Sequence, residues 1–128
     1  MTKTFEVGQI VTGIYKTGKY IGDVPIIKPA HYTVRVLAVL KHPDQGDLHN
    51  PKETDVALFH ERRALAHREQ VNIPSVYVKE YVEAVPDYTE SLKAALEKQK
   101  ATLQQDDSDW VRLSIEKLEN LEKDYFKH

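Results

Sequence analysis

The sequence predicts a mainly β fold with an α-helical appendage: a small β-barrel of short strands, followed by a C-terminal antiparallel helical hairpin. Two periodicities carry this prediction. Up to about Val82 the apolar residues alternate at a period of two, as in strands with one buried face, and from about Pro86 they recur at helical spacing. We therefore assign residues 1–84 to the barrel and residues 85–128 to the hairpin, which is expected to pack on the barrel or on a partner.

Three strands and a tight turn are predicted at the start of the chain. In the segment KTGK (16–19), Gly18 is expected to take the positive φ that a hairpin turn needs. Pro25 falls inside the second strand and indicates an edge strand or a bulge, because proline has no N–H to donate. The predicted strands cover residues 8–16, 20–28 and 31–42.

A long polar loop follows the third strand. The stretch PDQGDLHNPKETD (43–55) is rich in Pro, Gly, Asp and Asn, which are typical of loops. A loop of about a dozen residues in a compact domain is often functional. The apolar stretches VALF (56–59) and ALAHREQV (64–71) predict one or two further strands, although FHERRALAHRE (59–69) could equally form a helical turn.

The β region ends in a short motif, IPSVYV (73–78). It resembles the end of an SH3 domain, where a strand meets a one-turn 3₁₀ helix and then a short final strand. With four or five short strands before it, this resemblance implies a small SH3-like barrel. No polyproline groove is expected, because Val76 stands where Asn is common and no acidic, aromatic loop precedes the motif.

The helical hairpin has recognisable start signals. Asp87 with Glu90 three residues later indicates a helix N-terminus, and the helix is predicted from about residue 88 to 104. The segment QQDDSD breaks it, and Asp107 or Ser108 is expected to cap a second helix over about 109–126. Because the connector is short, the two helices should run antiparallel.

Composition excludes several classes of protein. The chain has 128 residues and a net charge of −2, which argues against a dedicated nucleic-acid binder. It has no cysteine, so disulfides, thiolate nucleophiles, cysteine-based metal centres and an N-terminal lipid anchor are not expected. We find no signal-peptide core and no apolar run of membrane-spanning length. A cytoplasmic protein is therefore expected, with any membrane association arising indirectly.

The histidines raise the question of a metal or catalytic site. Four of the six lie between residues 42 and 67, at intervals of seven, eleven and seven: His42, His49, His60 and His67. Metal motifs usually include one short interval, so this spacing disfavours a metal centre. Carboxylates are plentiful here, but no spacing selects an acid–base pair, and phosphate-loop and nucleophile-elbow motifs are absent. We predict no catalytic residue, no metal and no cofactor.

Several separate stretches, in order, resemble one family. They are GIYKTGKYIG, HPDQGDLHNP, FHERRALAHREQ, NIP and VPDYTESL. Over about residues 5–126, the amino-acid sequence resembles that of the kinase-associated protein B family of spore-forming Gram-positive bacteria, also called kinase-associated lipoprotein B. The resemblance implies an SH3-like barrel and a link to a membrane sensor histidine kinase that feeds the sporulation phosphorelay. It implies no catalytic residues.

We therefore expect a non-catalytic regulatory adaptor that acts by protein–protein binding. Loops held by a rigid scaffold often carry recognition residues, so the candidate partner-binding residues are Asp47, His49, Phe59, His60, Glu61 and Arg62. The helical hairpin is the second choice, and homo-oligomerisation is left open. One alternative is a nucleic-acid-binding SH3-like module using Arg62, Arg63 and Arg68, although Glu61 and Glu69 balance these charges. A more remote alternative is a metal-dependent enzyme built on the His/Asp-rich loop.

Overall fold

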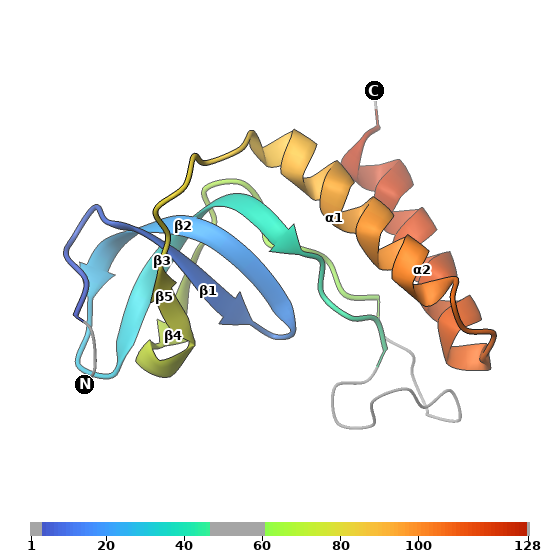
Figure 1. Ribbon diagram of the computed structural model, residues 1–128, viewed down its shortest axis with the longest axis horizontal. Helices are drawn as coiled ribbons and strands as arrows, with labels where there is room; N and C mark the ends of the chain where they lie inside the picture. Colours follow the sequence, from blue (N-terminus) through green and yellow to red (C-terminus); the bar gives the residue numbers. More distant parts are fainter. Residues whose placement is uncertain (1–3, 47–60, 128) are drawn as a thin grey trace.

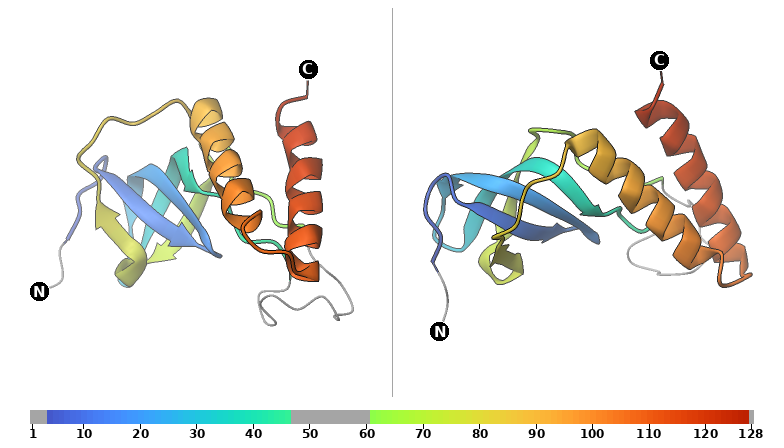
Figure 2. Two further views of the ribbon diagram at one scale, coloured as in Figure 1. Left: turned by 45° about the vertical axis from the view of Figure 1, so that its right-hand side comes forward. Right: turned by 45° about the horizontal axis from the view of Figure 1, so that its top comes forward.

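A five-stranded antiparallel sheet lies beside a pair of helices in the computed structural model, which describes residues 4–46 and 61–127 (Figure 1). The helices run antiparallel, and α1 lies between the sheet and α2 (Figure 2). The elements are β1 (Ile10–Tyr15), β2 (Gly18–Ile27), β3 (His31–Lys41), β4 (Gln70–Pro74), the 3₁₀ helix η1 (Ser75–Tyr77), β5 (Val78–Glu80), α1 (Tyr88–Leu103) and α2 (Asp109–Tyr125).

The sheet has the order β4-β3-β2-β1-β5, so β4 and β5 form its two edges. Each neighbouring pair is antiparallel. Within the described residues the two edge strands are not joined in a ladder, and the sheet stays open. The predicted combination of β and α structure is confirmed, whereas closure into a barrel is not.

The turn between β1 and β2 corrects one expectation. Tyr15 pairs with Gly18, so Lys16 and Thr17 form the two-residue turn, and they take the positive φ values of 46° and 70°. Two positive φ angles match the right-handed twist of a hairpin. Gly18 begins β2 instead. A Cβ at Gly18 would lie 2.4 Å from the Tyr20 hydroxyl oxygen, so the glycine is needed for close packing.

Pro25 marks a bulge and not a sheet edge. β2 lies in the sheet interior between β1 and β3, and its register with β3 shifts between Asp23 and Ile26. The shift removes the need for a ladder hydrogen bond from the proline nitrogen, because a bulge leaves its extra residue unpaired. Of the two alternatives that the sequence left open, the bulge is correct.

The motif at residues 73–78 forms the expected strand, 3₁₀ turn and short strand, as β4, η1 and β5. The stretch before it was expected to be strand or helix. Residues 61–69 are neither, apart from a turn at His67–Arg68, where Arg68 has a φ of 71°. Only the end of the strand predicted over 64–71 is confirmed, because β4 begins at Gln70. The stretch VALF (56–59) lies outside the described residues.

Both helix starts agree with the sequence. The Asp87 carboxylate accepts a hydrogen bond from the Glu90 backbone N–H, and the Ser108 hydroxyl accepts one from that of Val111. These bonds satisfy N–H groups that have no partner within the helix. In the described part of the chain, no helix is both long enough and apolar enough to cross a membrane.

The apolar residues form two clusters. One is formed by the sheet and the segment before it, and contains Phe5, Val11, Val24, Tyr32, Val34, Ile73 and Val78. The other joins the sheet to the helices and includes Tyr20, Val36, Val39, Leu92, Leu96, Val111 and Leu118. A polar contact adds to the second, since the Val39 backbone N–H donates to the Ser91 hydroxyl at 2.9 Å. The hairpin therefore packs on the sheet through α1, which positions both helices beside the end of β3.

Candidate partner-binding site

Two of the six candidate binding residues lie within the described chain. Glu61 is exposed and Arg62 is half-buried, and both follow the segment 47–60. Asp47, His49, Phe59 and His60 lie outside the described residues. The described flanks of this segment show how the candidate site is supported.

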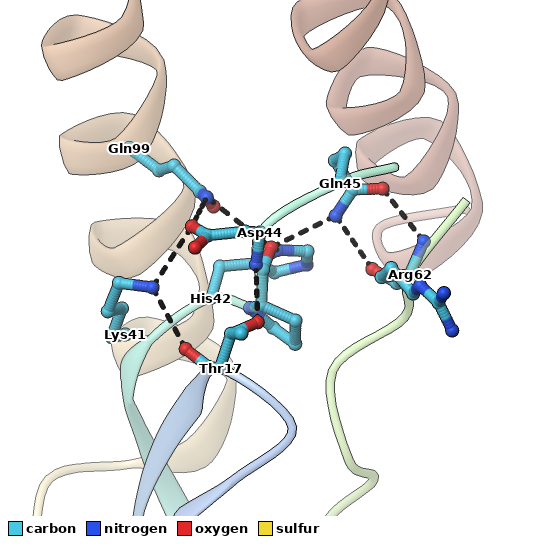
Figure 3. Close-up of polar contacts among 8 residues, drawn as sticks. Thr17, Lys41, His42, Asp44, Gln45, Arg62 and Gln99 are labelled. Atoms are coloured by element: carbon cyan, nitrogen blue, oxygen red, sulfur yellow. Dashed lines mark hydrogen bonds and ion pairs between the residues drawn. The ribbon is translucent and has the colours of Figure 1, made fainter. Parts of the chain in front are cut away.

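The side chain of Gln45 ties the two flanks together (Figure 3). Its Oε1 accepts from the Arg62 backbone N–H at 2.8 Å, and its Nε2 donates to the Arg62 carbonyl at 2.9 Å. Nε2 also donates to the Pro43 carbonyl at 3.0 Å, and the Arg62 Nε donates to the Gly46 carbonyl at 3.0 Å. A buried amide with this arrangement copies the reciprocal bonding of a paired strand residue. We call these contacts the Gln45–Arg62 clamp.

Behind the clamp, His42 connects the end of β3 to the end of α2. Its ring is fully buried, and its Nε2 lies 2.9 Å from the Tyr125 hydroxyl. The other ring nitrogen, Nδ1, lies 3.0 Å from the Pro43 carbonyl oxygen, which can only accept, so Nδ1 carries a proton. In the neutral ring Nε2 then accepts from the Tyr125 hydroxyl, whose oxygen accepts from the Ala64 backbone N–H at 2.8 Å. Burial lowers the pKa of His42 to about 4, which favours this neutral form.

The turn between β1 and β2 is attached to the same region. The Lys41 ammonium donates to the Thr17 carbonyl at 2.9 Å and to the Asp44 carboxylate at 3.0 Å. The Asp44 backbone N–H donates to the Thr17 hydroxyl at 3.0 Å. From α1, the Gln99 amide reaches the same carboxylate at 3.2 Å (Figure 3). Contacts among the β1–β2 turn, the end of β3 and α1 therefore hold residues 42–46 in place.

A shallow groove of about 300 Å³ opens over this support. Arg63 is held at its rim, because it pairs with Asp124 and its guanidinium lies 5.1 Å from the centre of the Tyr125 ring. Aromatic, apolar and oppositely charged side chains are mixed in its lining, as is common at protein–protein interfaces. The lining residues are Tyr15, Lys16, Tyr20, Pro43, Glu61, Arg62, Arg63, Leu65 and Glu69. We call this the Glu61 groove.

The contacts also bear on the other functional classes. Within residues 4–46 and 61–127, we find no cluster of three or more histidine, aspartate or glutamate side chains placed to hold a metal ion. His42 bonds to Tyr125 and Pro43, and the His67 ring lies 5.4 Å from that of Tyr88. Two of the three arginines of the basic cluster make contacts within the protein, since Arg62 donates to the Gly46 carbonyl and Arg63 pairs with Asp124.

Sequence reasoning did not identify the residues that build the support. Gln45 is one polar residue of the predicted loop, and Tyr125 lies near the end of the second predicted helix with no local sign of a polar role. The local sequence carries no signal for a bond between residues 83 positions apart, such as that between His42 and Tyr125. The alternation along the first strand could have placed Tyr15 on a different face from Ile14, but not beside Glu61.

Comparisons with known proteins agree with one another. A family model described as kinase associated protein B matches residues 15–126. A curated relative, kinase-associated lipoprotein B of Bacillus subtilis (strain 168), is 56% identical over 123 residues, which is 96% of each chain. Among solved structures, the chain is similar to kinase-associated protein B from Bacillus cereus. That match has a TM-score of 0.82 and 54% identity, covering 95% of this chain and 98% of the other.

Proposed function

This chain belongs to the kinase-associated protein B family, and we propose from that premise that it is a non-catalytic adaptor for a sensor histidine kinase. In this proposal it binds the cytoplasmic part of the kinase and supports the flow of phosphate into the sporulation phosphorelay. The names of the family and of its relatives support association with a kinase. That the kinase is a sensor histidine kinase, and that it feeds the sporulation phosphorelay, is inferred only from the resemblance of this sequence to the family.

The observation that carries the binding role is the Gln45–Arg62 clamp. It fixes the backbone on both sides of a long polar segment, and it does so with partly buried hydrogen bonds from a buried side chain. A fixed base lowers the entropy lost when a surface loop binds a partner. The Glu61 groove beside it supplies apolar and charged side chains within the same small area.

An adaptor of this kind can regulate without chemistry of its own. A kinase that exchanges between inactive and active states shifts toward the state to which the adaptor binds more tightly. The size of the shift equals the difference between the two binding free energies, so a tenfold preference corresponds to about 1.4 kcal/mol. We propose that the chain prefers the active state.

The sharpest test of the binding surface is Glu61. Its side chain is exposed, whereas Arg62 also holds the clamp, so a change at Arg62 would disturb the support as well. We expect His49→Ala, Phe59→Ala, His60→Ala and Glu61→Ala each to weaken capture of the purified cytoplasmic part of the kinase. Glu116→Ala, on the exposed side of α2, is the matched control. Unchanged capture by all four folded variants would remove the loop from the proposal.

The proposed lack of catalysis and the proposed location need their own measurements. We expect the purified chain on its own to leave ATP unhydrolysed. When it is added to the kinase, we expect the rate of kinase autophosphorylation or phosphotransfer to change. We propose that it works in the cytoplasm and reaches the membrane through the kinase. Fractionation of cells with and without the kinase would test this, and membrane association that persists without the kinase would contradict it.

A further inference from the structure

A second surface lies on the other side of the β1–β2 hairpin from the Glu61 groove. Tyr15 lines that groove, whereas the preceding residue, Ile14, faces the opposite way because side chains alternate along a strand. Here η1 follows β4, and a hollow of about 190 Å³ lies beside it. Its lining residues are Thr12, Ile14, Lys19, Val76, Tyr77 and Lys79, and we call this the η1 patch.

Large apolar side chains are exposed in the η1 patch without a packing role. Val76 is 78% exposed, Tyr77 52% and Ile14 44%. None of the three residues of η1 is buried, so the fold would keep its core if Val76 were polar. An isolated exposed apolar residue needs no explanation, but three around one hollow are typical of a surface that binds another molecule.

The patch also carries a local positive charge in a chain whose net charge is −2. The sheet register places Lys19 across from Ile14 and Lys79 across from Thr12, so both lysines flank the hollow. Among the described residues, neither ammonium group pairs with a carboxylate, and the lining contains no acidic residue. Glu80 follows Lys79 in β5 and therefore points to the other face.

We propose that the η1 patch binds an acidic segment of the partner kinase, with one apolar side chain of that segment seated between Ile14, Val76 and Tyr77. The two lysines attract and orient the segment, and the apolar centre supplies the buried area. The identity of the partner as the kinase rests on the proposed function. A nucleic acid fits less well, because two lysines around an apolar hollow do not form the extended basic surface that follows a phosphate backbone.

The first experiment measures binding of the purified cytoplasmic part of the kinase to wild type and variants. We expect K19E/K79E, and separately Val76→Asp, to weaken binding about tenfold at low salt, with a smaller effect at high salt. Val76→Asp is the safeguard against misfolding, because that side chain is 78% exposed. The control K98E/K123E makes the same change in net charge on the exposed side of the helices and should bind as wild type does. Equal binding by all the folded variants would overturn the inference while the adaptor function stands.

The second experiment does not depend on the kinase. A phage-displayed library of random 12-residue peptides is selected on the wild-type chain. We expect selected peptides that are rich in Asp and Glu around one large apolar residue, and that lose binding to K19E/K79E. Selection of neutral or basic peptides, or of none that depend on the patch, would overturn the inference. If a DNA duplex binds the wild type and competes with the selected peptides at the patch, the inference of an acidic peptide ligand is replaced by nucleic-acid binding. Failure of the kinase to bind wild type would refute the adaptor function alone, and the library would then decide the inference.

Discussion

Lowering the pH should destabilise this protein through one buried side chain, His42. In the folded chain the ring is neutral, and burial lowers its pKa to about 4, whereas its ordinary value is 6.5. Between these values the unfolded chain holds one more proton than the folded chain. The contribution to stability is therefore complete above about pH 6.5 and is lost progressively as the pH falls through 4. The two pKa values correspond to a loss of about 3 kcal/mol.

The geometry explains why the folded protein resists protonation at this position. The charge of a protonated ring would lie in a site with no exposure to water, and this burial is the main reason why the pKa is low. The nearby Lys41 charge lowers the pKa further, whereas the hydrogen bond to Pro43 and the Asp44 charge oppose the shift only in part. A loss of about 3 kcal/mol is large compared with the 5–15 kcal/mol by which a typical domain is stable.

Urea unfolding between pH 4.5 and 7.5, followed by Trp110 fluorescence and by circular dichroism, measures this effect. Wild type is compared with His42→Gln, whose amide does not titrate. We expect the difference in unfolding free energy between the two proteins to narrow by about 1.4 kcal/mol for each pH unit below 6.5. His31→Gln, at the exposed start of β3, controls for the loss of a histidine. Parallel pH profiles for wild type and His42→Gln would refute the reasoning.

Three further changes test the packing and the clamp by equilibrium unfolding. Gly22→Ala should cost about 3 kcal/mol or more, because the new Cβ would lie 2.3 Å from the Arg35 carbonyl oxygen, which the sheet holds in place; an unchanged midpoint would contradict this close approach. Gln45→Ala should cost about 1–3 kcal/mol, since it leaves the partly buried Arg62 backbone groups without their partner. A cost below about 0.5 kcal/mol would mean that the clamp contributes little. Leu118→Ala, at a site with no exposure, should cost about 2–5 kcal/mol, and a neutral result would contradict its place in the core between sheet and helices.

Much of the secondary structure could be predicted because its causes are local. The helix starts depend on Asp87 and Ser108, each of which bonds to a backbone N–H three residues later. The motif at residues 73–78 forms its turn from its own residues. The turn between β1 and β2 was located correctly, but the role of Gly18 was not, because the reason for this glycine is the approach of Tyr20 and not its own φ.

The candidate site was only partly predictable. The composition of residues 43–55 indicates a loop, and family resemblance indicates a partner. The support of the site lies elsewhere: Gln45 meets Arg62 across 17 residues and His42 meets Tyr125 across 83. No periodicity encodes such contacts, because they depend on how α1 packs against the sheet and how α2 packs against α1.

The sequence by itself determined the order of strands and helices, the caps that begin the helices and the family to which the chain belongs. These follow from interactions within a few residues, or from whole stretches of matching sequence. Only the tertiary structure decided that the sheet is open over the residues it describes, that the buried His42 ring links the end of β3 to the end of α2, and that Ile14, Val76 and Tyr77 share one exposed hollow. Each of these three features depends on contacts between side chains that are distant in the sequence. Such contacts are set by the packing of the complete fold.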